Sequence, residues 1–166
     1  MCVCVCTREG CVCVCVCVRF SFWREHIVDQ AHVSPSQVCG CLRNLSLNDI
    51  NRTAVVSCGG VEKLFNVLRL HRSHAGVTEQ ALACLGNLTN NEAARTAVVI
   101  AGSFGVVLDA MSRLPTVPVT VLVQCCIVIG NMCASPANQA LALEAGAAEA
   151  LLTAMDKHKT SEKKKE

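Results

Sequence analysis

Residues 79–111 read EQALACLGNLTNNEAARTAVVIAGSFGVVLDAM, and they decide the fold because related stretches lie on both sides of them. The segment LGNLT (85–89) corresponds to LRNLS (42–46) upstream and to IGNMC (129–133) downstream, so that the three asparagines lie 43 and 44 residues apart. A fixed period of this length is the signature of a protein built from stacked structural repeats.

A second set of segments gives the same period. ARTAVVIAGS (94–103) corresponds to NRTAVVSCGG (51–60) and to NQALALEAGA (138–147), and RTAVV is identical in the first two copies. The glycines aligned by these segments are again 43 and 44 residues apart: Gly59, Gly102 and Gly146. Because two independent markers agree, the sequence predicts roughly two and a half helical units of about 43 residues.

Each unit is predicted to hold three helices, and each aligned glycine can take the left-handed conformation that closes the first of them. The expected first helices span 51–57, 93–100 and 137–144. The second span 61–70, 104–113 and 147–157, with apolar residues at helical spacing. The third span 36–46, 77–88 and 118–132 and end near the asparagine. Since no unit can bury its apolar face alone, neighbouring units are expected to share a core.

Composition narrows the class of protein. Hydrophobic residues make up 52% of the 166 residues and charged residues 17%, but no run of 18 apolar residues occurs, so no membrane-spanning helix is expected. The net charge of +2 is too small to indicate binding to nucleic acid or to a membrane surface. The low aromatic content of 3%, with no Tyr, suits closely packed helices.

The first residues have a different character. Residues 2–18 read CVCVCTREGCVCVCVCV, an alternation typical of strands in which TREG could form a hairpin turn. Three interpretations compete: a metal or redox hairpin, a signal peptide, and a low-complexity product of a translated TGTGTG repeat. The preferred interpretation is the low-complexity product of a translated TGTGTG repeat. Residues 1–24 are therefore treated as a low-complexity segment, 34–158 as the repeats, and 159–166 as a charged tail.

Seven further cysteines are scattered through the helical pattern. They are expected to be reduced thiols that pack as small apolar side chains, since no secretory signature indicates an oxidising compartment: Cys39, Cys41, Cys58, Cys84, Cys125, Cys126 and Cys133. The pair His71 and His74 is read as part of a solvated loop. No metal ligand set, cofactor site or nucleophile beside a base is predicted, and the chain is not expected to be an enzyme.

A three-helix unit of 42–44 residues, with Gly before the second helix and Asn-Leu-Ser/Thr at the end of the third, resembles the armadillo repeat family. GGVEKLFNVL (59–68) and EQALACLGNLT (79–89) carry the likeness. VLRLH and AMDKH, at the ends of two second helices, are similar to the subgroup that includes armadillo repeat-containing protein 6 and the armadillo region of leucine-rich-repeat kinases. The resemblance implies an all-α, right-handed solenoid whose third helices line a concave groove for a peptide.

The resemblance implies a groove-facing role for the three aligned asparagines, Asn44, Asn87 and Asn131. Alignment of the repeats adds a second row seven residues earlier, Gln37, Gln80 and Gln124, on nearly the same helix face. Side-chain amides can donate to and accept from an extended peptide backbone. The alternative is that the asparagines instead satisfy backbone groups at the helix ends and hold the turns between units.

The sequence departs from the family at one position. Importin-type grooves carry Trp four residues before the Asn, where this chain has Gly40, Ala83 and Ile127, so binding of nuclear import signals is not expected. The predicted function is a non-enzymatic adaptor that binds a protein or extended peptide, with a cytoplasmic or possible nuclear location. The alternatives are a fragment of a larger armadillo-containing protein and a Cys-rich metal or redox protein.

Overall fold

The computed structural model describes residues 5–7, 10–12, 34–113 and 117–162, and it divides the chain into two units, Met1–Ser34 and Pro35–Glu166. In the first unit, strands β1 (Val5–Thr7) and β2 (Gly10–Val12) pair in antiparallel fashion, with Cys6 opposite Cys11. The hairpin expected around TREG is therefore confirmed for these residues. The other Cys-Val positions, and the codon-repeat hypothesis, lie outside the described residues.

The described residues of the second unit, 35–113 and 117–162, form helices in three repeating positions. The third-position helices are α2 (Pro35–Leu45), α5 (Ala75–Leu88) and α8 (Val119–Met132). The first-position helices are α3 (Asp49–Ser57), α6 (Glu92–Ile100) and α9 (Pro136–Glu144). The second-position helices are α4 (Gly60–Leu70), α7 (Ser103–Arg113) and α10 (Ala147–Glu162). This unit is all-α.

The observed helix bounds match the predicted ones within two residues, with one exception. Helix α10 continues to Glu162, whereas the predicted helix ends at residue 157. No glycine or proline follows Gly146, so nothing in residues 158–162 breaks the helical backbone. The start of the predicted charged tail is thus helical.

The turn between first and second helices is set by glycine in every unit. Gly59, Gly102 and Gly146 have φ of 71°, 79° and 82°, the left-handed region that other residues adopt at a cost. At the start of the first helices, Asn48 accepts a hydrogen bond from the Ile50 amide, and Asn91 accepts one from the Ala94 amide. Glycine and asparagine thus fix both ends of the first helix.

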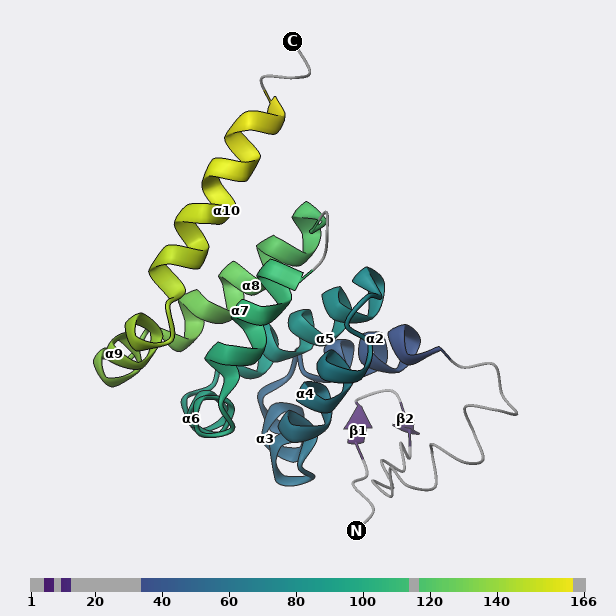
Figure 1. Cartoon of the computed structure of the whole chain (residues 1–166). Helices are drawn as coiled ribbons and strands as arrows, with labels where there is room; N and C mark the ends of the chain where they lie inside the picture. Colours follow the sequence, from purple (N-terminus) through teal and green to yellow (C-terminus); the bar gives the residue numbers. More distant parts are fainter. Residues whose placement is uncertain (1–4, 8–9, 13–33, 114–116, 163–166) are drawn as a thin grey trace. The chain divides into compact units, whose positions relative to one another are not determined.

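Second- and third-position helices of successive units pack side by side (Figure 1). Helix α5 lies between α2 and α8, and α7 contacts both α4 and α10. Helices α4 and α7 also pack on α5 and α8 respectively, which makes two layers. Each unit therefore buries its apolar face against the next unit as well as within itself.

One hydrophobic cluster runs through these layers. The predicted core positions of α4 are confirmed, since Leu64, Phe65 and Leu68 are each 1% exposed. In α10 the apolar residues at helical spacing are Leu151, Leu152 and Met155, and Leu151 packs against the cluster. Leu152 and Met155 are instead 61% and 55% exposed, because no described helix packs on their side of α10.

No single helix among the described residues is both long enough and apolar enough to cross a membrane. Helices α6 and α7 together meet the requirements of length and composition, but their axes are bent by 75° at the break between them.

The turn glycines provide a test of the unit boundary. We expect Gly102→Ala to lower the free energy of unfolding by about 1–2 kcal/mol, because Cβ disfavours the left-handed backbone there. Gly105, inside α7, has open space around an added Cβ, so Gly105→Ala should be neutral or stabilising by up to about 1 kcal/mol. Urea unfolding of both variants measures the difference. Equal stabilities would contradict the assigned role of Gly102.

Candidate functional site

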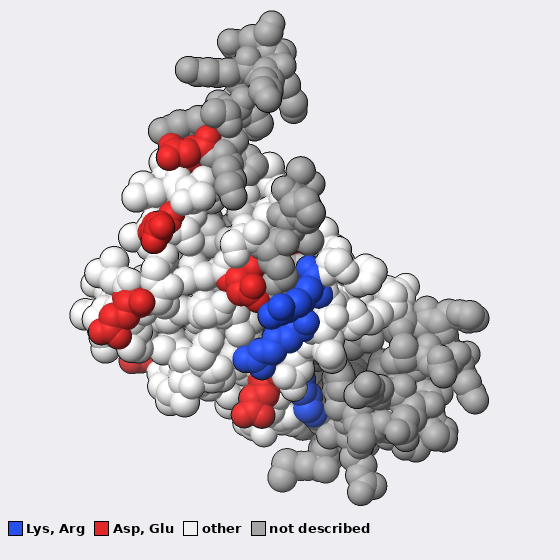
Figure 2. Space-filling view, viewed as in Figure 1, with Lys and Arg blue, Asp and Glu red and all other residues white. Residues whose placement is uncertain are grey.

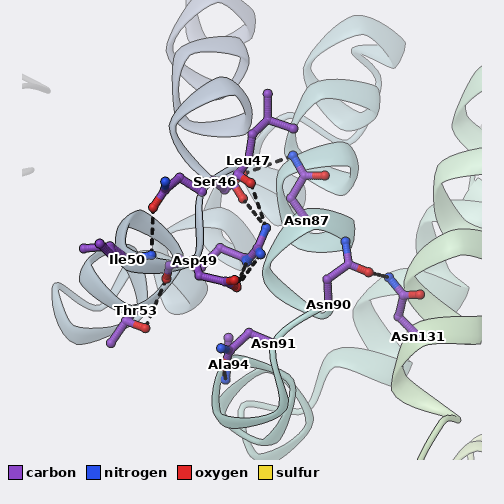
Figure 3. Close-up of polar contacts among 12 residues, drawn as sticks. Ser46, Leu47, Asp49, Ile50, Thr53, Asn87, Asn90, Asn91, Ala94 and Asn131 are labelled. Carbon is purple, nitrogen blue, oxygen red and sulfur yellow. Dashed lines mark hydrogen bonds and ion pairs between the residues drawn. The ribbon is translucent and has the colours of Figure 1, made fainter. Parts of the chain in front are cut away.

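The predicted site residue Asn87 connects two neighbouring third helices (Figure 3). Its Nδ2 donates to the Arg43 carbonyl oxygen at 3.0 Å and to the Ser46 hydroxyl at 3.2 Å, both near the end of α2. Ser46 is fully buried, and its own hydroxyl donates to the same Arg43 carbonyl at 2.7 Å. One amide from α5 therefore satisfies polar groups that α2 leaves open at its last turn.

Asn131 repeats this arrangement one unit later. Its Nδ2 lies 3.1 Å from the Gly86 carbonyl oxygen and 3.2 Å from the Thr89 hydroxyl, at the end of α5. Thr89 is buried and donates to the Gly86 carbonyl, as Ser46 does to Arg43. The Asn131 amide also reaches Oδ1 of Asn90 at 3.2 Å. We call this repeated set of bonds the amide bracket.

Asn44, the first asparagine of the row, differs from the other two. It is exposed, and among the described residues no third helix precedes α2 to accept a bond from its amide. Asn87 and Asn131 are half-buried. The structural role considered for these residues is therefore observed for Asn87 and Asn131. Peptide contact by the three asparagines remains a prediction.

The glutamine row is not uniform. Gln80 accepts a hydrogen bond from the Arg43 guanidinium at 3.2 Å, so Gln80 and Asn87 both contact Arg43 across the α2–α5 boundary. This places the two amides of α5 on the same side of that helix, as the seven-residue spacing predicts. Gln37 is exposed and Gln124 is half-buried. The structure thus brings Gln80 and Asn87 together around Arg43.

A second repeated bond was not anticipated from the sequence. Arg52 donates to the Ser46 and Leu47 carbonyls, Arg95 donates to the Thr89 carbonyl, and Gln139 donates to the Cys133 carbonyl. Each first helix in this way satisfies the end of the preceding third helix, at an offset of six residues from Ser46, Thr89 and Cys133. The identity of RTAVV in two copies was the available signal.

The amide oxygens remain available after these bonds are formed. Among the described residues, no donor is bonded to Oδ1 of Asn87 or of Asn131, and this atom is on the opposite branch of the amide from the bonded Nδ2 (Figure 3). An acceptor held in place at 43- to 44-residue intervals is chemically suited to an N–H donor from a ligand backbone.

The positions four residues before the asparagines vary in size along the stack. Gly40 is half-buried and Ala83 is 8% exposed, whereas Ile127 on α8 is 43% exposed. Val123 and Val119, one and two turns earlier on α8, are also exposed, at 47% and 59%. The third-helix surface therefore changes from small and polar at α2 to aliphatic at α8.

Charged side chains on this unit are few and mixed in sign. Most of the described surface in Figure 2 is uncharged, with Lys and Arg in a short stripe and a smaller separate patch, and Asp and Glu in scattered patches. Arg72 pairs with Asp109 at 3.4 Å, and Arg52 pairs with Asp49. Exposed pairs of this kind contribute little to binding or stability.

The seven scattered cysteines are free thiols, and they fall into three groups by burial. Cys39, Cys84 and Cys125 are buried as expected, and burial raises the pKa of these thiols to about 11, 12 and 12 respectively. Cys58 and Cys133 are half-buried. The prediction of core packing is wrong for Cys41 and Cys126, which are exposed because they face sides of α2 and α8 that no described helix covers.

Metal-ligand types are not grouped in this part of the chain. The rings of His71 and His74 lie 6.0 Å apart, and their loop follows the end of α4. Within residues 5–7, 10–12, 34–113 and 117–162, no three His, Cys, Asp or Glu side chains are close enough together to hold a metal ion.

Comparison with other proteins supports the fold alone. No protein-family model matches the chain, and a search of curated proteins finds no match. Among solved structures, the crystal structure of an engineered protein is similar, with a TM-score of 0.65 and 19% sequence identity over 71% of this chain. The match spans 48% of that protein, about half its length.

The amide bracket predicts that substitutions of the three aligned asparagines differ in their effect on the free energy of unfolding. Asn87→Ala and Asn131→Ala should each destabilise the chain by about 1–3 kcal/mol, because buried carbonyl and hydroxyl groups lose a donor. Asn44→Ala is the matched control and should change the free energy of unfolding by less than about 0.5 kcal/mol. Chemical denaturation measures all three. The bracket is refuted if Asn44→Ala costs as much as Asn87→Ala.

Thiol chemistry gives a second test. With iodoacetamide at pH 8, Cys41 and Cys126 should be alkylated first, while Cys39, Cys84 and Cys125 react last, since the thiolate is the nucleophile and their burial disfavours it. Peptide mass spectrometry assigns each site. Rapid labelling of Cys84 in the folded chain would be inconsistent with the structure.

Burial of Cys39, Cys84 and Cys125 also makes the free energy of unfolding depend on pH. A raised pKa in the folded state gives stability that is complete below the ordinary thiol value of 9.0 and is lost as pH rises through about 11 to 12. Thermal unfolding between pH 8 and 11 should therefore show falling stability, and Cys84→Ala should reduce the slope. An unchanged slope would contradict this assignment.

Proposed function

We propose that the second unit is an armadillo-type α-solenoid and that the chain is a non-enzymatic module that binds an extended peptide or protein segment. The binding surface would be the side of α2, α5 and α8 that carries the asparagine and glutamine rows. The partner is a protein, and neither nucleic acid nor membrane is proposed. The chain would act as an adaptor in the cytoplasm, with the nucleus as a second possible location.

The observation that carries this proposal is the orientation of the Asn87 and Asn131 amides. Their Nδ2 atoms are held by the preceding helix, so Oδ1 stays at a fixed place with little conformational entropy left to lose on binding. A peptide in extended conformation presents backbone N–H groups to such acceptors. The half-burial of both side chains favours a stronger hydrogen bond than a fully solvated amide would make.

The side chains beside the amides suggest the character of the ligand. On α2 and α5 the positions four residues before the asparagines carry only small residues, Gly40 and Ala83, and Ala83 is 8% exposed. Val119, Val123 and Ile127 offer an exposed aliphatic strip on α8. A bound segment with an apolar side chain at the α8 end would remove this strip from water, which contributes about 25 cal/mol per Å².

A random linear-peptide display library tests the proposed function with the full chain. We expect selected peptides whose affinity falls about tenfold in the double variant Asn44→Ala, Gln124→Ala, equivalent to about 1.4 kcal/mol. Neither residue belongs to the amide bracket, so folding should be retained. Asn66→Ala on the exposed side of α4 is the matched control and should leave affinity unchanged.

Two outcomes would reject the peptide-binding surface. One is that no peptide is enriched over an unrelated helical protein. The other is that enriched peptides bind the double variant as tightly as the unmodified chain, whereas Asn66→Ala lowers their affinity. That result would show that the peptides bind to the second-position helices.

A further inference from the structure

The last unit exposes an apolar surface, here called the C-terminal end face. It is formed by side chains of α9 and α10 that are 45–67% exposed, together with the exposed Cys126 of α8: Leu141, Leu143, Leu152 and Met155. Five such residues on adjoining helices are unusual for a surface that stays in water.

The positions equivalent to Met155 and Cys126 are buried in the preceding unit, whereas those equivalent to Leu141, Leu143 and Leu152 are half-buried: Ala97, Val99 and Leu108. Leu68 and Met111 are 1% and 6% exposed, whereas Met155 in the same register is 55% exposed. Leu82 on α5 is fully buried, but its counterpart Cys126 on α8 is exposed. In the earlier units, side chains at these positions pack against the following unit. In the last unit the side chains at these positions are also apolar, but no described helix covers them.

The other end of the stack presents the complementary side of the same contact. Gln37, Cys41 and Asn44 on α2 are exposed, and we call them the N-terminal end face. Their counterparts on α5 are Gln80, Cys84 and Asn87, all of which contact α2. The end face of α2 thus carries the residue types with which α5 recognises a preceding third helix.

The acceptors that this face requires are present at the end of α8. In the repeat alignment, the Gly130 carbonyl corresponds to the Gly86 carbonyl, and Cys133 corresponds to Thr89. Gly86 and Thr89 accept from Asn131. Among the described residues no side chain donates to the Gly130 carbonyl, and an added Cβ at Gly130 would meet nothing within 4 Å. Each end therefore holds one half of an amide bracket.

We propose that a second copy of this chain stacks head to tail on the first, with α2 of one copy against α8 of the other. Asn44 of the added copy would donate to the Gly130 carbonyl, as Asn87 donates to Arg43 within one chain. Because the two faces differ, the contact is heterologous and can continue into open chains of copies.

The register of this stack makes a specific pair of cysteines adjacent. Within the chain, Cys84 Sγ lies 3.8 Å from the Ser46 hydroxyl oxygen. In the contact between two copies, the repeat alignment puts Cys41 of one copy in the place of Cys84. It puts Cys133 of the other copy in the place of Ser46. Sulfur atoms at that spacing can be joined by an added oxidant such as diamide, which takes up the two hydrogens when the S–S bond forms. The stack should thus yield a Cys41–Cys133 link between copies.

Variants that block one end at a time give the decisive experiment. Cys126→Glu with Leu152→Glu places charge on the C-terminal end face, and Cys41→Glu places it on the N-terminal end face. All three residues are exposed, so circular dichroism should show unchanged helix content. In analytical ultracentrifugation, the unmodified full chain should grow beyond a dimer as concentration rises. Each blocked variant alone should stay monomeric, and an equal mixture of the two should form dimers only.

The outcomes distinguish this stack from other arrangements. A monomer at every concentration overturns the proposal. So does a dimer that Cys41→Glu leaves intact but the C-terminal variant abolishes, because that dimer would join two C-terminal end faces by two-fold symmetry. Mass spectrometry after diamide should find the Cys41–Cys133 link between isotopically distinct copies, with Cys58→Ser as a control that retains it. A link of Cys126 to Cys126 in its place would also overturn the stack.

Discussion

The structure depends on one constraint, which is that the last carbonyl groups of each third helix need hydrogen-bond donors. An α-helix leaves these carbonyls open, and the neighbouring unit partly covers several of them. The chain supplies the donors from the next unit, with Asn87 or Asn131 from the following third helix and Arg52, Arg95 or Gln139 from the following first helix. The polar ends therefore fix the register at which apolar faces meet.

Under the proposed function, this arrangement would connect stability to binding through single side chains. The amide joins two units through Nδ2 and would present Oδ1 to the proposed ligand. The same bonds link only neighbouring units, and stability in such proteins is approximately a sum of unit and interface terms. Where no described helix covers an outer position, that half of the interface is exposed, as at Asn44 and Met155.

Much of the fold follows from repetition in the sequence. Aligned glycines and the spacing of Leu64, Phe65 and Leu68 were enough to locate the helices and one core face, because backbone conformation and helical period are local properties. Burial at the ends was harder to predict. Leu152 and Cys126 have core-like patterns, but their exposure depends on whether another unit covers them. The role of Arg52 was missed because its acceptors are main-chain carbonyls: the repeated RTAVV marks the donor, but no side-chain pattern identifies the acceptors.

A double-mutant cycle on Asn131 and Thr89 tests the amide bracket most directly. Urea unfolding of Asn131→Ala, Thr89→Ala and the combined variant gives the coupling free energy between the two side chains, which lie 3.2 Å apart. The structure predicts a coupling of about 0.5–1.5 kcal/mol, because each residue loses a partner when the other is removed. Strictly additive effects would show that the third helices are held in register by apolar packing alone, and would contradict the bracket.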